Sequence, residues 1–86
     1  GKAFFIDACK QWQDRMTMHK SAGNFVLVQF KSYEEKIDLL TYLAEHDIFV
    51  RDTTQTPSVR NCFRITIGTR PQMERVIQVI EKFYAR

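Results

Sequence analysis

The stretch from Ile48 to Thr69, IFVRDTTQTPSVRNCFRITIGT, decides how this chain folds. It contains two short segments rich in apolar and β-branched residues, 48–51 and 62–67, and the polar residues between them include one proline. This pattern predicts two strands joined by a loop. Each strand carries one arginine, Arg51 in the first and Arg64 in the second. An arginine within a mostly apolar strand is costly unless an anionic group meets it, so these two are the candidate binding residues.

Strand alternation assigns each residue of this stretch to one face of the sheet. One face of the second strand is apolar, and we expect it to pack against helices: Phe63, Ile65 and Ile67. The opposite face carries a mixed set of side chains that the predicted elements leave bare: Phe49, Arg51, Cys62, Arg64 and Thr66. Because bare apolar side chains seek cover, Phe49 and Cys62 predict that the isolated chain self-associates.

The rest of the sequence predicts three helices and up to two further strands. Apolar residues recurring every three or four positions indicate a helix from residue 3 to about 14, and alternation in 15–20 leaves a short strand open. A nearly continuous apolar run at 25–30 predicts a central strand, well flanked or covered on both faces. Capping-box patterns predict helices that begin after Ser32 and after Thr69.

The middle helix is predicted to bury an apolar stripe and to end near Asp47, where left-handed backbone is wanted and glycine is usual. That stripe is Ile37, Leu40, Leu43 and Ala44, with Leu39 beside it. The order of elements predicts an α+β two-layer sandwich, with a three- or four-stranded, mostly antiparallel sheet and helices packed on one face. We expect residues 1–86 to form a single domain.

The composition narrows the class of protein. The chain has 86 residues, 44% of them hydrophobic, which suffices for a core. Its net charge of +3 comes with interspersed acids, so nucleic acid is not an expected partner, and no apolar run is long enough for a membrane span. Two cysteines, Cys9 and Cys62, make no disulfide framework, so a reduced, cytoplasmic protein is expected. Gly1 in place of a start Met suggests a tag remnant on a piece of a longer chain.

Catalytic machinery is not visible in the sequence. His19 and His46 have no metal-ligand spacing to either cysteine, and no glycine-rich phosphate loop is present. An RNA-recognition strand has a small residue and an aromatic residue at the positions that Val26 and Leu27 occupy here. The pattern for base stacking is therefore not met. We therefore expect no catalytic, metal or cofactor-binding residues in this chain, and no enzymatic activity from it alone.

The two arginines have alternative interpretations. Arg51 could be a surface charge paired with Asp52, and Arg64 could form a salt bridge to another domain or protomer. Alternatively, both guanidinium groups grip anionic groups of a ligand, because arginine stays charged and binds carboxylates with two parallel hydrogen bonds.

Three quoted segments resemble a known family. Asn61 to Thr69 (NCFRITIGT), preceded by Ile48 to Asp52 (IFVRD), and Ser21 to Val28 (SAGNFVLV) resemble the C-terminal small domain of fold-type I pyridoxal-phosphate aminotransferases. Within that family the resemblance is strongest to the histidinol-phosphate aminotransferase group. Asp47 departs from the family's usual glycine, and the loop from Thr53 to Arg60 falls where related enzymes diverge.

The resemblance implies an active role only within a longer chain. Arg64 would bind the substrate α-carboxylate, and Arg51 would help to hold a substrate phosphate. The intact enzyme would transfer an amino group between histidinol phosphate and 2-oxoglutarate in histidine biosynthesis, and it would be a homodimer. Pyridoxal phosphate would be bound by the large domain of the same chain, since no lysine here has a matching context: Lys2, Lys10, Lys20, Lys31, Lys36 and Lys82.

A second class of function stays open on the residues themselves. A stand-alone α+β binding or regulatory domain would use the same sheet face for an acidic ligand or a partner. The length of the natural gene separates the two hypotheses.

Overall fold

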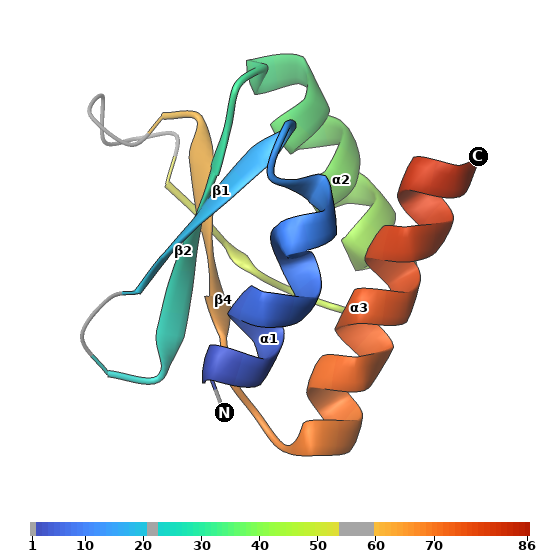
Figure 1. Ribbon diagram of the computed structural model, residues 1–86. Coiled ribbons are helices and arrows are strands. Elements are labelled where there is room, and N and C mark those ends of the chain that lie inside the picture. The colour runs from blue at the N-terminus through green and yellow to red at the C-terminus, as the bar shows by residue number, and fades with distance from the viewer. Residues whose placement is uncertain (1, 21–22, 54–59) are drawn as a thin grey trace.

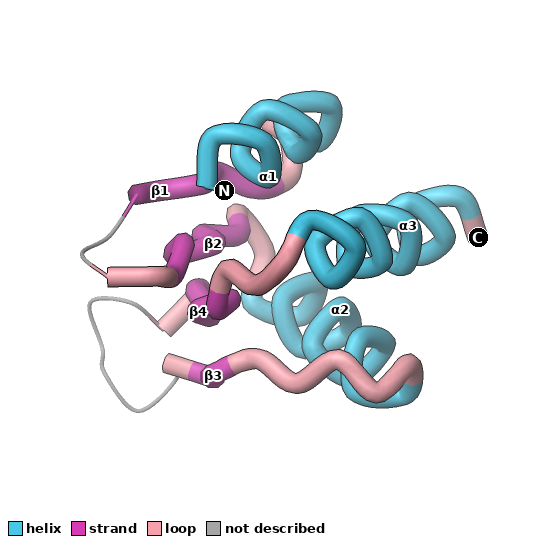
Figure 2. The backbone as a smooth tube through the Cα atoms, turned by 90° about the horizontal axis from the view of Figure 1, so that it is seen from below, coloured by secondary structure: helices cyan, strands magenta, loops and turns pink. Residues whose placement is uncertain are grey.

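The structure, a computed structural model, describes residues 2–20, 23–53 and 60–86 (Figure 1). Gly1, residues 21–22 of a predicted turn and residues 54–59 of the predicted loop lie outside the described residues. Over the described ranges the chain forms two layers, with the helices on one side of an antiparallel sheet (Figure 2). The predicted α+β two-layer sandwich is confirmed.

Helices and pairs of strands follow one another along the described chain. In chain order they are helix α1 (Lys2–Ala8), 3₁₀ helix η1 (Cys9–Trp12), strands β1 (Met16–Lys20) and β2 (Phe25–Phe30), helix α2 (Tyr33–Glu45), strands β3 (Arg51–Asp52) and β4 (Cys62–Thr66), and helix α3 (Arg70–Ala85). Within the described residues the sheet has four strands in the order β1-β2-β4-β3, and each neighbouring pair is antiparallel. The short strand that the sequence left open is present as β1, and β2 is flanked on both sides.

Side-chain caps fix where two of the helices begin. The Ser32 side chain accepts a hydrogen bond from the Glu35 backbone N–H at the start of α2. Before α3, Thr69 and Gln72 form a complete capping box, and Pro71 lies in the first turn. These caps satisfy backbone N–H groups that have no partner within the helix. Both predicted helix starts are confirmed.

The core lies between the sheet and the helices. Alternate residues of β2 and β4 supply its sheet side: Val26, Val28, Phe30, Phe63 and Ile65. The helices cover them with apolar residues that recur at helical spacing: Phe5, Cys9, Leu39, Leu43, Met73, Ile77, Ile80 and Phe83. Each large side chain buried in this way contributes about 1.5–3 kcal/mol. The apolar face predicted for the strand at residues 62–67, which is β4, is therefore on the inner face of the sheet.

Two details of the predicted helices differ in the structure. The first α-helix ends at Ala8 and continues only as a 3₁₀ turn to Trp12, since the chain must reverse to enter β1. The predicted stripe of α2 is confirmed for Leu43 and for Leu39 beside it, which are buried. The other three predicted residues are not buried, because Ile37 and Leu40 are half-buried and Ala44 is exposed, and Lys36 is buried instead. The prediction for Asp47 is confirmed, because its φ is 62°.

The strand predicted for residues 48–51 is much shorter in the structure. Only Arg51 and Asp52 pair with β4, because the backbone at Ile48 still donates a hydrogen bond to Leu43 O at the end of α2. Phe49 is 80% exposed, as the bare face predicted. Cys62, also placed on that face, is 3% exposed, so its predicted exposure was wrong. Thr53 Oγ1 donates to the Cys62 carbonyl at 2.7 Å, so the chain after β3 passes close beside it.

Candidate functional site

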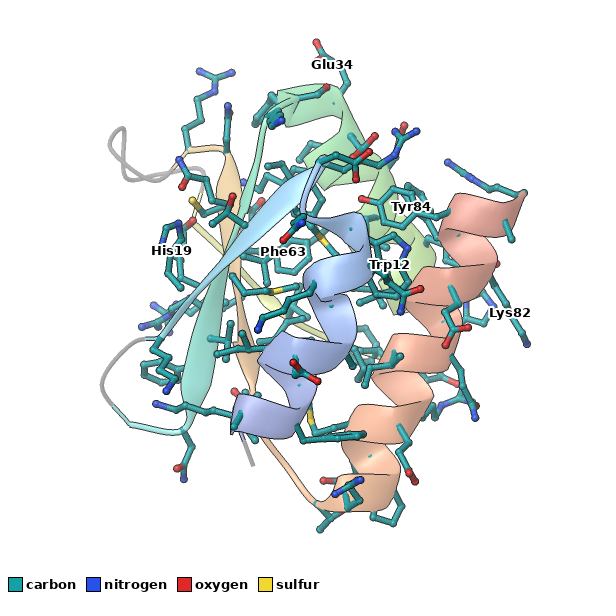
Figure 3. The ribbon with its side chains drawn as sticks, in the orientation of Figure 1. Trp12, His19, Glu34, Phe63, Lys82 and Tyr84 are labelled. Atoms are coloured by element: carbon teal, nitrogen blue, oxygen red, sulfur yellow. The ribbon has the colours of Figure 1, made fainter. Side chains whose placement is uncertain are left out.

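The face of the sheet turned away from the helices is the candidate site, and we call it the outer face. Its residues alternate with the inward-facing ones and meet across the strands: Thr17, His19, Phe25, Leu27, Gln29, Arg51, Arg64 and Thr66. Cys62 shares this face by register but is itself buried. Figure 2 shows that the described helices all lie on the other side. Figure 3 shows His19 on the side of the sheet away from the helices and Phe63 between the two layers.

Arg51 and Arg64 lie directly opposite each other on this face. They are register partners across β3 and β4, so their side chains share one face. Like charges in that position repel, which destabilises the strand pair. Neither arginine has a carboxylate within ion-pair distance among the residues that the structure describes. The pair is therefore a concentration of positive charge on the outer face.

The Arg51–Asp52 pairing considered from the sequence does not occur. Asp52 is opposite Phe63, which places it on the inner face, where its Oδ1 accepts from Lys36 Nζ at 2.6 Å. The carboxylate next to Arg51 in sequence is thus turned to the other side of the sheet.

Arg64 is held by its neighbours on β2. Its register partner is Leu27, and its guanidinium carbon lies 4.5 Å from the centre of the Phe25 ring. Stacking of this kind uses the flat face of the guanidinium and leaves the N–H donors around its rim available to a ligand. Arg64 is half-buried in a central strand, whereas Arg51 is exposed on the edge strand. Arg64 is therefore the more enclosed of the two arginines.

Polar side chains extend the outer face beyond the arginines. His19 Nε2 lies 2.7 Å from Gln29 Oε1, and His19, Leu27, Arg64 and Arg51 form one row across the four strands. Sequence reasoning considered His19 as a metal ligand, for which its spacing to the cysteines is unsuitable. Its position in the row depends on strand register, which the sequence does not reveal.

Sequence reasoning also missed Lys36. Its side chain is fully buried, and its Nζ donates at 2.6 Å to Asp52 Oδ1 and at 2.6 Å to the Arg60 carbonyl. The sequence did contain a signal for the burial of this lysine, because position 36 precedes the buried Leu39 and Leu43 at helical spacing. A lysine at such a position is ordinarily taken for a residue of the solvent face.

The cysteines offer no reactive thiolate. Burial raises the pKa of Cys9 to about 12. Burial also raises the pKa of Cys62, and the charge of Lys36 opposes that change only in part. Both thiols are free, buried and neutral near pH 7, which makes them poor nucleophiles.

A second polar cluster lies at the far end of the helical layer. Glu35 accepts from Arg15 Nη1 at 3.0 Å and from the Tyr84 hydroxyl at 3.0 Å. Trp12 packs on Tyr84 with 5.7 Å between ring centres (Figure 3). Burial, followed by the hydrogen bond to Glu35, raises the pKa of Tyr84. These contacts join η1 and the turn before β1 to α2 and α3, so the cluster stabilises the packing of these elements.

Residues 2–20, 23–53 and 60–86 contain neither a metal-binding cluster nor a membrane-spanning helix. No group of three or more His, Cys, Asp or Glu side chains in these ranges could hold a metal ion. No helix in them is long and apolar enough to cross a membrane.

Comparisons with known proteins agree with this architecture. Residues 2–80 match the family described as aminotransferase class I and II. The chain is 34% identical over 61 residues to histidinol-phosphate aminotransferase of Colwellia psychrerythraea, which covers 71% of this chain and 17% of that protein. It is 33% identical over 79 residues to histidinol-phosphate aminotransferase of Buchnera aphidicola subsp. Cinara cedri, covering 92% of this chain and 22% of that protein.

Solved structures give the same fold. L-threonine-O-3-phosphate decarboxylase from Porphyromonas gingivalis superposes with a TM-score of 0.78 at 25% identity, over 98% of this chain and 26% of that one. A putative aminotransferase from Burkholderia pseudomallei superposes with a TM-score of 0.76 at 26% identity, over 95% of this chain and 24% of that one.

The chain belongs to the class I and II aminotransferase family. It spans about a fifth of the length of the curated relatives it matches, between 15% and 22%.

Aminotransferases of this family depend on pyridoxal phosphate, and the described residues do not fit that group. The cofactor aldehyde needs an available lysine amine. The buried lysine of the described residues, Lys36, already donates to Asp52 and Arg60. We therefore derive no chemical step through the cofactor from this chain.

Proposed function

We propose that this chain is the substrate-binding small domain of a pyridoxal-phosphate aminotransferase. The observation that carries the proposal is the cross-strand pair Arg51 and Arg64, which faces away from the helices. Two arginines on neighbouring strands suit a phosphate or carboxylate, because each guanidinium group can donate two parallel hydrogen bonds.

The proposed substrates are the amino-alcohol phosphate histidinol phosphate and the oxo acid 2-oxoglutarate. The curated relatives are named histidinol-phosphate aminotransferases, and one structural neighbour is named for L-threonine-O-3-phosphate. Both names describe phosphorylated amines. A site that accepts such molecules and an oxo acid in turn must bind a phosphate and a carboxylate, for which two arginines are suited.

Each arginine has its own role in this proposal. Arg64, stacked on Phe25 in a central strand, fixes the α-carboxylate of 2-oxoglutarate and so orients the reacting carbon. Histidinol phosphate has no carboxylate, so in this proposal its phosphate takes that place and binds Arg64 together with Arg51. Arg51, on the edge strand, reaches a phosphate group of the substrate. Charged hydrogen bonds contribute about 1.5–3 kcal/mol each, so loss of a bidentate pair should cost several kcal/mol of transition-state binding.

The remaining parts of the enzyme lie outside this chain in the proposal. Pyridoxal phosphate, bound on a large domain of the same protein, supplies the electron sink for amino-group transfer. The outer face would close over that domain, and the exposed Phe49 would be covered there. We also propose that the intact enzyme is a homodimer and that it acts in histidine biosynthesis in the cytoplasm.

The test uses the natural full-length protein. An Arg64→Lys variant should lose most of its kcat/KM with histidinol phosphate and 2-oxoglutarate while the cofactor absorbance stays normal. Arg70→Lys is the matched control, because Arg70 is an exposed arginine on α3 whose Nε lies 3.8 Å from Glu74. Unchanged turnover in Arg64→Lys would remove Arg64 from the site. A natural gene that encodes no further domain would favour a stand-alone binding module.

A further inference from the structure

Lys36 is an unusual residue for the interior of a small helical layer. Its side chain is 0% exposed, yet it carries an ammonium group. A buried charge destabilises the fold by several kcal/mol unless it is paired and hydrogen-bonded. The partners of the Lys36 ammonium group must therefore be held in place, and their identity indicates which part of the fold Lys36 fixes.

Lys36 ties together the two ends of the connection between β3 and β4. Its Nζ donates to Asp52 Oδ1, at the end of β3, and to the Arg60 carbonyl, just before β4, each at 2.6 Å. Thr53 Oγ1 adds a bond to the Cys62 carbonyl at 2.7 Å. These contacts fix β3 against β4, although β3 itself is only two residues long.

Such an anchor opposes a repulsion that the site itself creates. Arg51 is opposite Arg64, and two like charges at that spacing push the edge strand away from the central one. Asp52 is the next residue after Arg51 and points to the other face of the sheet. A bond that holds the Asp52 carboxylate on the inner face therefore holds Arg51 in place on the outer face.

We propose that Lys36 is a positioning residue that holds Arg51 opposite Arg64 and thereby sets the preference of the site for phosphorylated substrates. This inference rests on the proposed function, because it assumes that Arg51 meets a substrate phosphate. Lys36 itself touches no substrate, since it lies on the helical side of the sheet.

The test is a double-mutant cycle in the full-length protein. The value of kcat/KM is measured with histidinol phosphate and with histidinol, which differ only in the phosphate, for wild type, Lys36→Met, Arg51→Ala and the double variant. Arg51→Ala should lower the ratio of the two values by about 10- to 100-fold, the range for one charged hydrogen bond. Lys36→Met should lower the same ratio by at least about fivefold, and in the Arg51→Ala background it should lower it no further.

A purely structural role for Lys36 gives a different result. It would reduce both values of kcat/KM together and leave their ratio unchanged, which would overturn the inference while Arg51→Ala still lowers the ratio. If Arg51→Ala leaves the ratio unchanged, the phosphate role of Arg51 fails, and the inference fails with it.

Two further variants complete the test. Lys82→Met removes an exposed lysine from α3 and should leave the ratio unchanged (Figure 3). Should Lys36→Met fail to fold, Asp52→Asn is judged by the same criteria. It keeps the shape of the side chain and an oxygen acceptor but removes the opposing charge.

Discussion

Replacing Asp52 with alanine is expected to destabilise the chain more than replacing its partner Lys36 with methionine. The two side chains form one ion pair, but their surroundings differ: Lys36 is 0% exposed and Asp52 is 39% exposed. Asp52→Ala leaves an ammonium group buried without its counter-charge. Lys36→Met leaves a carboxylate that water can reach, and methionine fills the space of the aliphatic stem.

The magnitudes follow from these exposures. Removing one partner of a fully buried pair costs about 3–5 kcal/mol of stability. Because water reaches the Asp52 side of this pair, Asp52→Ala should lower the unfolding free energy by about 3 kcal/mol. Lys36→Met removes a hydrogen bond to the Arg60 carbonyl and should cost about 1 kcal/mol. The double variant should resemble Lys36→Met, since no buried ammonium remains to be stranded.

Urea denaturation of the three variants, followed by far-UV circular dichroism, measures these differences. A common slope with urea concentration is required for the comparison. A Lys36→Met variant that loses as much stability as Asp52→Ala, or more, would refute the reasoning, because it would mean that the ammonium is not the more costly group to leave unpaired.

Three further predictions concern the fold. Asp47 has a φ of 62°, so Asp47→Gly should match or exceed wild-type thermal stability, whereas Asp47→Val should lower it by about 1–2 kcal/mol. Phe63 is fully buried, and Phe63→Ala should lower the unfolding free energy in urea by about 3–5 kcal/mol. Folding raises the pKa of Cys9 from 9.0 to about 12, so the thiol favours the folded state below pH 9 and loses that contribution as pH rises from 9 toward 12. The stability difference between wild type and Cys9→Ala should shrink over this range, and a constant difference would contradict the burial of the thiol.

Much of the fold could be predicted from local patterns. The apolar alternation of residues 62–67 assigned Phe63 and Ile65 to the buried face, and the caps at Ser32 and Thr69 marked two helix starts correctly. These features depend on residues close in sequence, so a local pattern records them.

The missed features depend on residues that are distant in sequence. Lys36 looks like a surface residue until Asp52, sixteen positions later, is brought to it by the fold. β3 is shorter than its apolar pattern indicated because the end of α2 retains Ile48 through a backbone hydrogen bond. Cys62 is buried although strand alternation places it on the outer face, because burial also depends on tertiary neighbours that alternation does not contain.

The candidate site was predicted only in part. Alternation within each strand turned Arg51 and Arg64 away from the helices, but their direct opposition is a matter of strand register. The stacking of Arg64 on Phe25 likewise comes from β2 lying beside β4. The roles of both arginines in substrate binding, and the self-association of the isolated chain, stay predictions.

The central claim is that Arg51 and Arg64 together bind the anionic group of the substrate. An arginine-specific dicarbonyl reagent, applied to the full-length protein with mass-spectrometric quantification of each site, tests it most directly. Histidinol phosphate at ten times its Kd should slow modification of both residues by about tenfold, since only the free protein reacts, while the control Arg70 reacts at an unchanged rate. Modification of Arg51 and Arg64 at the same rate with and without histidinol phosphate would contradict the account.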